Sequence, residues 1–315
     1  MLPFKSLISS NQLNPDILQE FFRITDEMAE IAAKHGRSDL LDDKIVALLF
    51  FEPSSRTMLS FQSAAQRLKA GTIFAQNAGS TSLEKGESIE DLIRVTEGYS
   101  DIIVMRHAQP GSAEIAAGAC DVPFINAGDG GNEHPTQAII DAYTIYKHKG
   151  RLDNLHVVLG YDSLQSRSIH SLTKLLAQYP NNKLTFIGPE KLFPSAILLE
   201  ELRSQGVQCN TEDTAVLVEG VDIIYLNRLQ EERFEDRELF ERNRRKYRLQ
   251  FEDIEQSDVL ILDPLPRIDE ISTAVDALPN ALYFKQTSYG VPVRMALLAS
   301  LLGKLWLNLE KSVES

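Results

Sequence analysis

The sequence predicts an α/β protein of two domains, each a mostly parallel sheet with helices on both faces. Short apolar runs alternate with amphipathic stretches along the chain, a pattern typical of parallel sheets that are covered by helices. The chain has 315 residues, about twice the length of a typical domain. The alternation pauses at KGRLDN, residues 149–154, and then restarts, which indicates a domain junction there.

The predicted elements follow this alternation. Asn14 suits the N-cap of a first helix and Pro15 its first turn, apolar residues recur at positions 17, 21, 24, 28 and 31, and Gly36 can end that helix. Strands are predicted over residues 44–50, 71–76, 101–105, 121–126, 154–160, 183–188, 221–226, 258–262 and 281–284. Helices are predicted around residues 59–68, 134–148, 168–178 and 195–202, and a last apolar helix over residues 291–309.

The charge and cysteine content exclude several classes of protein. With 32 basic and 45 acidic residues the net charge is −13, and no basic run offers a face for nucleic acid or an anionic membrane. Cys120 and Cys209 show neither CxxC spacing nor a cluster, which favours reduced thiols over a disulfide or a metal site. No segment approaches the ~20 apolar residues of a membrane span. We therefore expect a cytoplasmic protein.

Two basic motifs follow strands of the first domain. Ser54, Ser55, Arg56 and Thr57 come between the strand 44–50 and a helix, and hydroxyl, N–H and guanidinium groups at a helix N-terminus suit a phosphate. A plain capping turn explains the serines equally well, although Arg56 on a first turn favours an anion. Arg106 follows the strand 101–105. Because ligands bind beyond the carboxyl ends of parallel strands, we expect both motifs at one edge.

His134 and Gln137 stand at the start of another helix, after a glycine-rich turn at residues 128–131. Pro135 suits the first helical position, which puts His134 at the N-cap. The positive end of a helix disfavours imidazolium, so His134 should be neutral and able to donate to a carbonyl oxygen. A capping or core histidine is the alternative. The turn contains neither a G-x-G-x-x-G fingerprint nor a Walker A motif.

Two arginines follow strands of the second domain. Arg167 begins a helix after the strand 154–160, and Arg228 follows the strand 221–226. Guanidinium groups at strand ends suit bidentate recognition of carboxylates, and surface salt bridges are the alternative. The sequence has neither an HExxH zinc motif nor a nucleophile elbow, so metal and Ser-His-Asp catalysis gain no support.

Taken in order, these motifs resemble the catalytic chains of the aspartate carbamoyltransferases, within the aspartate/ornithine carbamoyltransferase family. The resemblance spans nearly the whole chain. It rests on Ser54-Ser55-Arg56-Thr57, Lys85-Gly86-Glu87, Val104-Met105-Arg106-His107, His134-Pro135-Thr136-Gln137, Arg167 with His170-Ser171-Leu172, Arg228 with Gln230, and Pro264-Leu265-Pro266-Arg267. The last two segments indicate the aspartate branch.

The resemblance implies transfer of a carbamoyl group from carbamoyl phosphate to the amine of L-aspartate, in pyrimidine biosynthesis, with no metal and no cofactor. Carbamoyl phosphate would bind a domain of residues 1–136, onto which a helix of residues 291–315 packs back. Aspartate would bind a domain of residues 137–290, with the active site in the cleft between them. The phosphate ligands would be Ser54, Ser55, Arg56, Thr57 and Arg106.

The resemblance also implies the remaining roles. His134, with Arg106 and Thr57, would polarise the carbamoyl C=O. Gln137 and the carbonyl of Leu265, ahead of a cis bond to Pro266, would hold the carbamoyl amide. The aspartate ligands would be Arg167, Arg228 and Gln230. Ser82 and Lys85 would reach a neighbouring subunit's site, which implies a homotrimer with shared active sites. Regulatory chains are neither required nor excluded.

One departure keeps other functions open. Where the family usually has histidine, this chain has Asp263, and an extra carboxylate should weaken anion binding unless it pairs with a base such as Arg267. One alternative is therefore a carbamoyltransferase for a different amine acceptor. The others are a catalytically weak assembly subunit of the same fold and a generic nucleotide-binding α/β protein.

Overall fold

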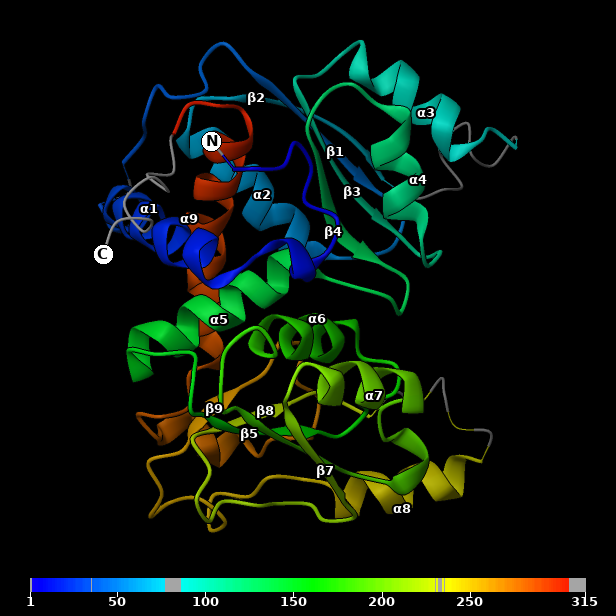
Figure 1. Ribbon diagram of the computed structural model, residues 1–315, viewed down its shortest axis with the longest axis vertical. Coiled ribbons are helices and arrows are strands. Elements are labelled where there is room, and N and C mark those ends of the chain that lie inside the picture. Colours follow the sequence, from blue (N-terminus) through cyan, green and yellow to red (C-terminus); the bar gives the residue numbers. More distant parts are fainter. Residues whose placement is uncertain are drawn as a thin grey trace. The chain divides into compact units, whose positions relative to one another are not determined.

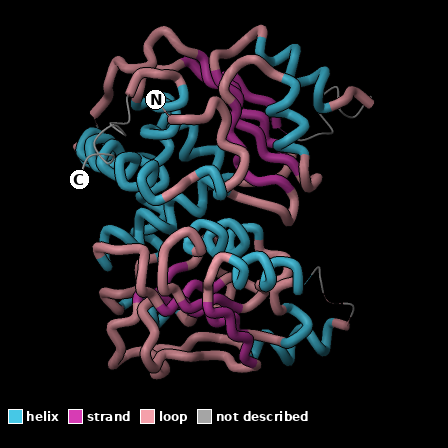
Figure 2. Tube along the Cα trace, viewed as in Figure 1, coloured by secondary structure: helices cyan, strands magenta, loops and turns pink. Residues whose placement is uncertain are grey.

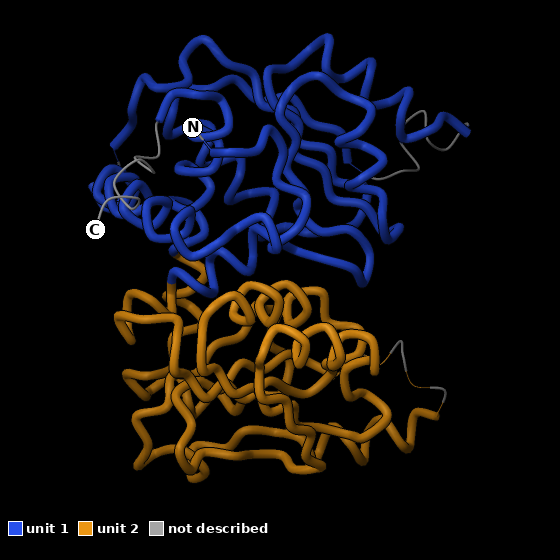
Figure 3. Tube along the Cα trace, in the orientation of Figure 1, with its two compact units in different colours: residues 1–143, 289–315 blue, residues 144–288 orange. Residues whose placement is uncertain are grey.

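The described residues form two compact units (Figure 3). A computed structural model of the chain describes residues 2–34, 36–76, 86–229, 231, 234 and 236–305. As far as they are described, residues 1–143 and 289–315 make up unit 1, and residues 144–288 make up unit 2. The chain passes from unit 1 to unit 2 within helix α5 (Pro135–Lys149) and returns within helix α9 (Tyr283–Leu301).

Each unit is built on one parallel sheet, which confirms the predicted fold class (Figure 2). In unit 1 the strand order is β2-β1-β3-β4, and the strands are β1 (Ile45–Phe50), β2 (Gly71–Gln76), β3 (Ile102–His107) and β4 (Phe124–Asp129). In unit 2 the order is β7-β6-β5-β8-β9, and the strands are β5 (His156–Gly160), β6 (Lys183–Ile187), β7 (Gln208–Glu212), β8 (Ile223–Leu226) and β9 (Leu260–Leu262). Every pairing between neighbouring strands is parallel.

Helices cover both faces of the unit 1 sheet (Figure 1). α3 (Ile89–Glu97) and α4 (Ser112–Ala119) lie on one side, and α2 (Ser55–Arg67) lies on the other with α1 (Pro15–Ala33) beyond it. Successive side chains of β1 point to opposite faces of the sheet, which explains why helices cover both. Ala47 and Leu49 pack in one cluster with Ile93 of α3. The intervening residues Val46 and Leu48 are buried as well. A strand buried on both faces is typical of a parallel sheet.

Unit 2 buries its sheet in the same way. Helices α6 (Arg167–Leu176) and α7 (Ala196–Ser204) lie on one side of it in Figure 1. On the other side, Val158 and Ile261 of the strands pack in one cluster with Phe240 of α8 (Arg237–Lys246) and Val275. No helix of the described residues is long and apolar enough to cross a membrane.

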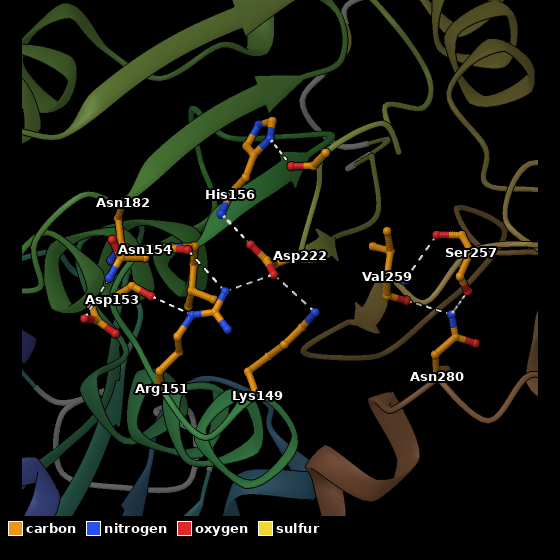
Figure 4. A network of polar contacts seen from close by, with 12 residues as sticks. Lys149, Arg151, Asp153, Asn154, His156, Asn182, Asp222, Ser257, Val259 and Asn280 are labelled. Carbon is orange, nitrogen blue, oxygen red and sulfur yellow. Dashed lines mark hydrogen bonds and ion pairs between the residues drawn. The ribbon is translucent and has the colours of Figure 1, made fainter.

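A polar network ties the amino ends of the unit 2 strands together (Figure 4). Asp222, just before β8, accepts hydrogen bonds from the His156 backbone at 3.0 Å and from Lys149 and Arg151 at 3.3 Å each. The His156 ring contacts the Gly220 carbonyl at 2.9 Å. The network holds the end of α5 and the starts of β5 and β8 together. It therefore stabilises the edge opposite to the one where ligands bind parallel sheets.

The first helix confirms its predicted start, and other elements correct the predictions. Asn14 caps α1 by accepting from the Ile17 N–H at 2.9 Å, and Pro15 is the first helical residue. The strand predicted over residues 281–284 is wrong, because Ala281 makes only an isolated bridge to Ile261 and Tyr283 begins α9. Strand β7 was not predicted because its QCNTE sequence is polar, and Cys209 is its one buried residue.

Candidate active site

The ends of β1 and β3 bring two of the predicted motifs to one edge of the unit 1 sheet. Phe50, the last residue of β1, pairs with Arg106 of β3. The Phe51 N–H then donates to the Arg106 carbonyl at 2.9 Å. Helix α2 begins at Ser55, a few residues after β1. The anion-binding residues expected on separate segments therefore share the carboxyl edge of one sheet.

The N-terminus of α2 differs from those of its neighbours. Ser54 is the N-cap, yet within the described residues its side chain makes no capping hydrogen bond, whereas Asn14 and Ser88 cap α1 and α3. Ser55 and Arg56 are exposed at this end of the helix, and Thr57 is buried. Backbone N–H groups at such an end, with hydroxyls and a guanidinium beside them, suit an oxyanion.

Arg106 is buried at the same edge, with 8% of its surface exposed. Its Nε lies 3.2 Å from Glu52 Oε2, and the side chain of Glu52 is 30% exposed. The next residue, His107, accepts a hydrogen bond on Nδ1 from the Gln109 N–H at 3.0 Å. Burial lowers the pKa of His107, and Glu52 acts against this shift. The lowered pKa favours a neutral His107, so Arg106 is the residue of β3 that contributes a positive charge to this edge of the sheet.

Carboxylates fix the loop that leads to His134. Glu133 is buried and accepts from Ser9 Oγ at 2.7 Å, from the Ser10 N–H at 2.9 Å and from Ser10 Oγ at 2.8 Å. Asp129, at the end of β4, accepts from the Glu133 N–H at 3.1 Å. These contacts anchor Glu133, the residue before His134, to the N-terminal segment and to the end of β4.

His134 precedes α5, which begins at Pro135 as predicted. The histidine is 5% exposed, its carbonyl accepts from the Gln137 N–H at 2.9 Å, and its Nδ1 lies 3.4 Å from Thr136 Oγ1. The Gln137 side chain donates to Asp141 Oδ1 at 2.7 Å. His134 just before α5 and Gln137 on its first turn therefore follow β4, the strand that neighbours β3.

In unit 2, Arg167 and Arg228 stand at the carboxyl edge of its sheet. Arg167 is the first residue of α6, whose N-cap Ser166 accepts from the Ile169 N–H at 3.4 Å. Arg228 follows β8, the neighbour of β5, and the loops after these strands are tied by Asn227, which donates to the Asp162 carbonyl at 3.0 Å. Both arginines are half-buried.

The segment after β9 completes this edge. Leu265 and Pro266 are joined by a cis bond, and Leu265 has a φ of 58°. Asp263 is 1% exposed, and its Oδ1 accepts from the Leu265 N–H at 2.5 Å. Arg267, the base considered above as a partner for Asp263, instead donates to both oxygens of Asp276 and to the Tyr283 hydroxyl. The extra carboxylate is thus buried beneath the segment.

Some predicted residues fall outside this description, and others were missed. Ser82, Lys85 and Gln230 lie outside the described residues. Two acids were not predicted: Glu133, which anchors the loop before His134, and Asp141, which accepts from Gln137. Their signal in the sequence is a lone acid beside or one helical turn after a predicted ligand, and many surface acids share it.

Comparison with known proteins decides the family. The model of the aspartate/ornithine carbamoyltransferase carbamoyl-P binding domain matches residues 5–147, and that of the Asp/Orn binding domain matches residues 153–301. The chain belongs to the aspartate/ornithine carbamoyltransferase family. Within this family, it is 41% identical over 300 residues to the aspartate carbamoyltransferase catalytic subunit of Methanococcus vannielii, covering 95% of this chain and 98% of that protein.

Other members agree in sequence and in structure. The Thermococcus onnurineus catalytic subunit is 42% identical, covering 96% of this chain and 98% of that protein. The M. jannaschii catalytic subunit structure has a TM-score of 0.90 at 39% identity, covering 95% and 98% of the two chains. The Trypanosoma cruzi aspartate transcarbamoylase, in complex with N-(phosphonacetyl)-L-aspartic acid, has a TM-score of 0.88 at 33% identity, covering 95% and 96%.

Proposed function

We propose that this protein transfers the carbamoyl group of carbamoyl phosphate to the amine of L-aspartate, giving N-carbamoyl-L-aspartate and phosphate. One observation carries the proposal. In a chain that matches both domains of the family, Arg106 and the α2 N-terminus share one edge of the unit 1 sheet, and His134 follows the next strand of that sheet. That edge provides cationic and N–H groups for an acyl phosphate.

Carbamoyl phosphate binds unit 1 in this proposal. The N–H and hydroxyl groups of Ser54, Ser55 and Thr57, with the guanidinium groups of Arg56 and Arg106, hold the phosphate. His134, assisted by Arg106 and Thr57, donates to the carbamoyl oxygen. Gln137 and the Leu265 carbonyl hold the amide. The unit 1 groups are preorganised, since α2 and α5 fix their starting residues.

Aspartate binds unit 2 through its two carboxylates, with Arg167, Arg228 and Gln230 as their ligands. Two half-buried guanidinium groups at one sheet edge suit a dicarboxylate better than a cationic acceptor such as ornithine, because fork-shaped donors bind carboxylates bidentately. Burial raises the pKa of Asp263 well above its usual value, which favours the uncharged acid and so weakens the objection to a dianionic acceptor.

The transfer then follows from charge and geometry. The lone pair of the neutral aspartate amine attacks the carbamoyl carbon and forms the C–N bond. The negative charge that develops on the carbamoyl oxygen is stabilised by Arg106 and His134. The C–O bond to phosphate breaks, and the amine proton leaves with the phosphate. Removing one oxyanion donor should cost about 3–4 kcal/mol, and orientation of the two substrates supplies much of the remaining acceleration.

The proposal extends to assembly and cellular place. We infer that Ser82 and Lys85 complete the site of a neighbouring subunit, so the working unit is a homotrimer, acting in the cytoplasm in pyrimidine biosynthesis. Mixing inactive Lys85→Ala and Arg106→Ala chains should then restore part of the activity, because some sites in mixed trimers carry neither change. If the mixture stays inactive after subunit exchange is demonstrated, the shared site is wrong.

Phosphate release with carbamoyl phosphate and a panel of amines tests the function. We expect release with aspartate, loss of turnover in Arg56→Ala, and weakened aspartate use in Arg228→Ala. Arg23→Ala is the matched control, since Arg23 is an exposed arginine of α1 that pairs with Glu20 and Glu27. Release with another amine alone would identify a different acceptor. No release with any amine would support an assembly subunit.

A further inference from the structure

Two carboxyl groups are buried together behind the segment that contains Leu265. Asp263 directly follows β9 and is 1% exposed, and Glu270, seven residues later, is 3% exposed. Carboxylates are rarely buried so completely unless they are paired with a cation or fully hydrogen-bonded. The two acids therefore require an explanation, because Arg267, the base considered as a partner for Asp263, is bound to Asp276.

One oxygen of each acid holds the backbone of the segment. Asp263 Oδ1 accepts from the Leu265 N–H at 2.5 Å. Glu270 Oε2 accepts from the Ile268 N–H at 2.9 Å and from the Asp269 N–H at 3.0 Å. The acids thus hold both ends of residues 264–269, including Leu265 with its positive φ of 58°, a conformation that a β- or γ-branched side chain adopts only under constraint.

The other oxygens indicate a proton between the acids. Asp263 Oδ2 and Glu270 Oε1 are both buried, and neither accepts a hydrogen bond from a donor in the described part of the chain. The acids are neighbours, since the charge of Glu270 acts on Asp263, and a hydrogen bond between Asp263 Oδ2 and Glu270 Oε1 would satisfy both atoms. Two ionised carboxylates have no hydrogen to share, so such a bond requires a proton on one of them.

We propose that Asp263 and Glu270 share one proton and act as a buried acid pair that positions Leu265. The Asp263 carboxyl donates to Glu270 Oε1, while the remaining oxygens accept the three backbone N–H groups. Every polar atom of the pair is then satisfied. The positioning role rests on the proposed function, in which the Leu265 carbonyl holds the carbamoyl amide. The shared proton does not depend on that function.

The surrounding charges assign the proton to Asp263. Burial raises the pKa of Asp263 well above its usual value, and the nearby Glu270 raises it further. Burial also raises the pKa of Glu270, whereas the Ile268 N–H and the positive charge of Arg228 act in the opposite direction. Arg267 acts weakly on Asp263.

Two further groups surround the pair. Burial raises the pKa of the Tyr161 phenol, and the charge of Glu270 adds to this shift. The phenol donates to the Ala215 carbonyl at 3.0 Å. Gln286 Oε1 accepts from the Asp263 N–H at 3.1 Å. Neither group is a cation. In this proposal the pair carries a single negative charge at neutral pH, held by Glu270, on which the positive charge of Arg228 acts.

Amide substitutions test the pair because an amide can replace one carboxylic acid. In Asp263→Asn, the Asn oxygen accepts from Leu265 and its NH₂ group donates to Glu270. In Glu270→Gln, the oxygen accepts from the backbone and the NH₂ group donates to Asp263. In the double variant, two NH₂ groups face each other. We expect each single variant to fold and the double variant to be destabilised by more than the sum of the two.

The pH dependence of unfolding tests the proton itself. Because the folded protein keeps a proton that the unfolded chain releases above about pH 4, stability should fall as pH rises toward the raised pKa of the pair. The unfolding constant of the native protein should therefore rise by up to about tenfold per pH unit relative to that of Asp263→Asn. Exposed Glu255→Gln controls for the loss of one carboxylate. The infrared spectrum at neutral pH should also show a protonated carboxyl band that Asp263→Asn lacks.

The outcomes separate this inference from the proposed function. Equal pH dependence in the native protein and Asp263→Asn, or an additive double variant, would refute the shared proton. If the pH dependence is present but no amine releases phosphate, the pair is correct and the function is wrong. If transfer occurs and the single and double variants show the same KM for carbamoyl phosphate, the pair does not position Leu265.

Discussion

Gln137 donates a hydrogen bond to Asp141, with 2.7 Å between Nε2 and Oδ1, along one face of α5. Asp141 is fully buried and Gln137 is half-buried. The bond restricts the side-chain amide of Gln137, and it engages the NH₂ group and not the side-chain oxygen. An acid hidden one turn into the helix thus sets the direction of a proposed substrate ligand.

Replacing Asp141 should impair the use of carbamoyl phosphate. Asp141→Leu removes the acceptor, and a hydrogen bond to a charged group contributes about 1.5–3 kcal/mol, so kcat/KM for carbamoyl phosphate should fall by about 10-fold to 150-fold. Asp141→Asn retains an acceptor oxygen and should lose less. Steady-state kinetics of both variants check this. Equal kinetics in Asp141→Leu and the native protein would contradict the role given to Gln137.

Asp141 should also be coupled to Arg294 of α9. Arg294 is 3% exposed, its Nη1 donates to the Gly290 carbonyl at 3.3 Å, and its guanidinium lies 4.9 Å from the ring centre of Phe61. Burial lowers the pKa of Arg294 to about 9, and the charge of Asp141 acts against this shift. The acid is thus the charge that compensates a buried cation.

A double-mutant cycle measures that coupling. Arg294→Met should destabilise the protein because it leaves the Asp141 charge buried without a cation, and Asp141→Asn should reduce that cost. We expect a coupling free energy of about 1–3 kcal/mol between the two changes, measured by urea unfolding. Additive effects would show that the charges do not interact. Kinetics of Arg294→Met would further show whether the cation acts on Gln137 through Asp141.

Much of the fold could be predicted because its signals are local. Strand β1 is a continuous apolar run and β3 begins with one, and Asn14 and Pro15 mark the start of α1 by capping chemistry. Strand β7 could not be predicted in this way, since an edge strand with one buried residue carries no apolar signal. The residues after Leu282 were ambiguous because a short apolar run fits a strand or a helix.

The positions of the candidate site residues could be predicted where a residue stands at a strand end or a helix start. Arg106, His134 and Arg167 occupy such positions, which the strand–helix alternation reveals. Asp263 was recognised as unusual, but its partner could not be found from sequence. Glu270 and Arg267 are both near Asp263 in the chain. The fold favours Glu270 as the partner, because Glu270 is buried and Arg267 contacts Asp276 instead.

Asp276 should stabilise unit 2 with a pH dependence opposite to that of the Asp263–Glu270 pair. Hydrogen bonds from Arg267 lower the pKa of Asp276 below its usual value. A depressed pKa gives stability that is present above the unfolded value of about 3.9 and is lost as pH falls through the folded value. Asp276→Asn should therefore lower the free energy of unfolding by about 1 kcal/mol at pH 7. The difference in this free energy between the variant and the native protein should shrink in acid. A difference that stays constant down to acid unfolding would exclude the ion pair as its cause.

Gly188, which follows β6, should tolerate no side chain. Its φ is 136°, and a Cβ atom built on it would lie 2.5 Å from the carbonyl oxygen of Tyr161, a backbone atom of a buried residue in the unit 2 core. Gly206 is the matched control, because its φ of 85° is also positive while no heavy atom lies within 4 Å of its Cβ position. Alanine at Gly206 adds backbone strain alone, which costs about 1–2 kcal/mol.

Alanine at Gly188 adds a backbone clash to that strain, and overpacking costs a further 1–3 kcal/mol or so. Urea unfolding should therefore show Gly188→Ala about 1–3 kcal/mol less stable than Gly206→Ala. Since Tyr161 leads directly into the loop tied to Asn227, we also expect Gly188→Ala to weaken aspartate use through a shift of Arg228, whereas Gly206→Ala should leave it unchanged. Equal free energies of unfolding of the two alanine variants would mean that the backbone at Tyr161 moves to make room for the Cβ atom without destabilising the protein.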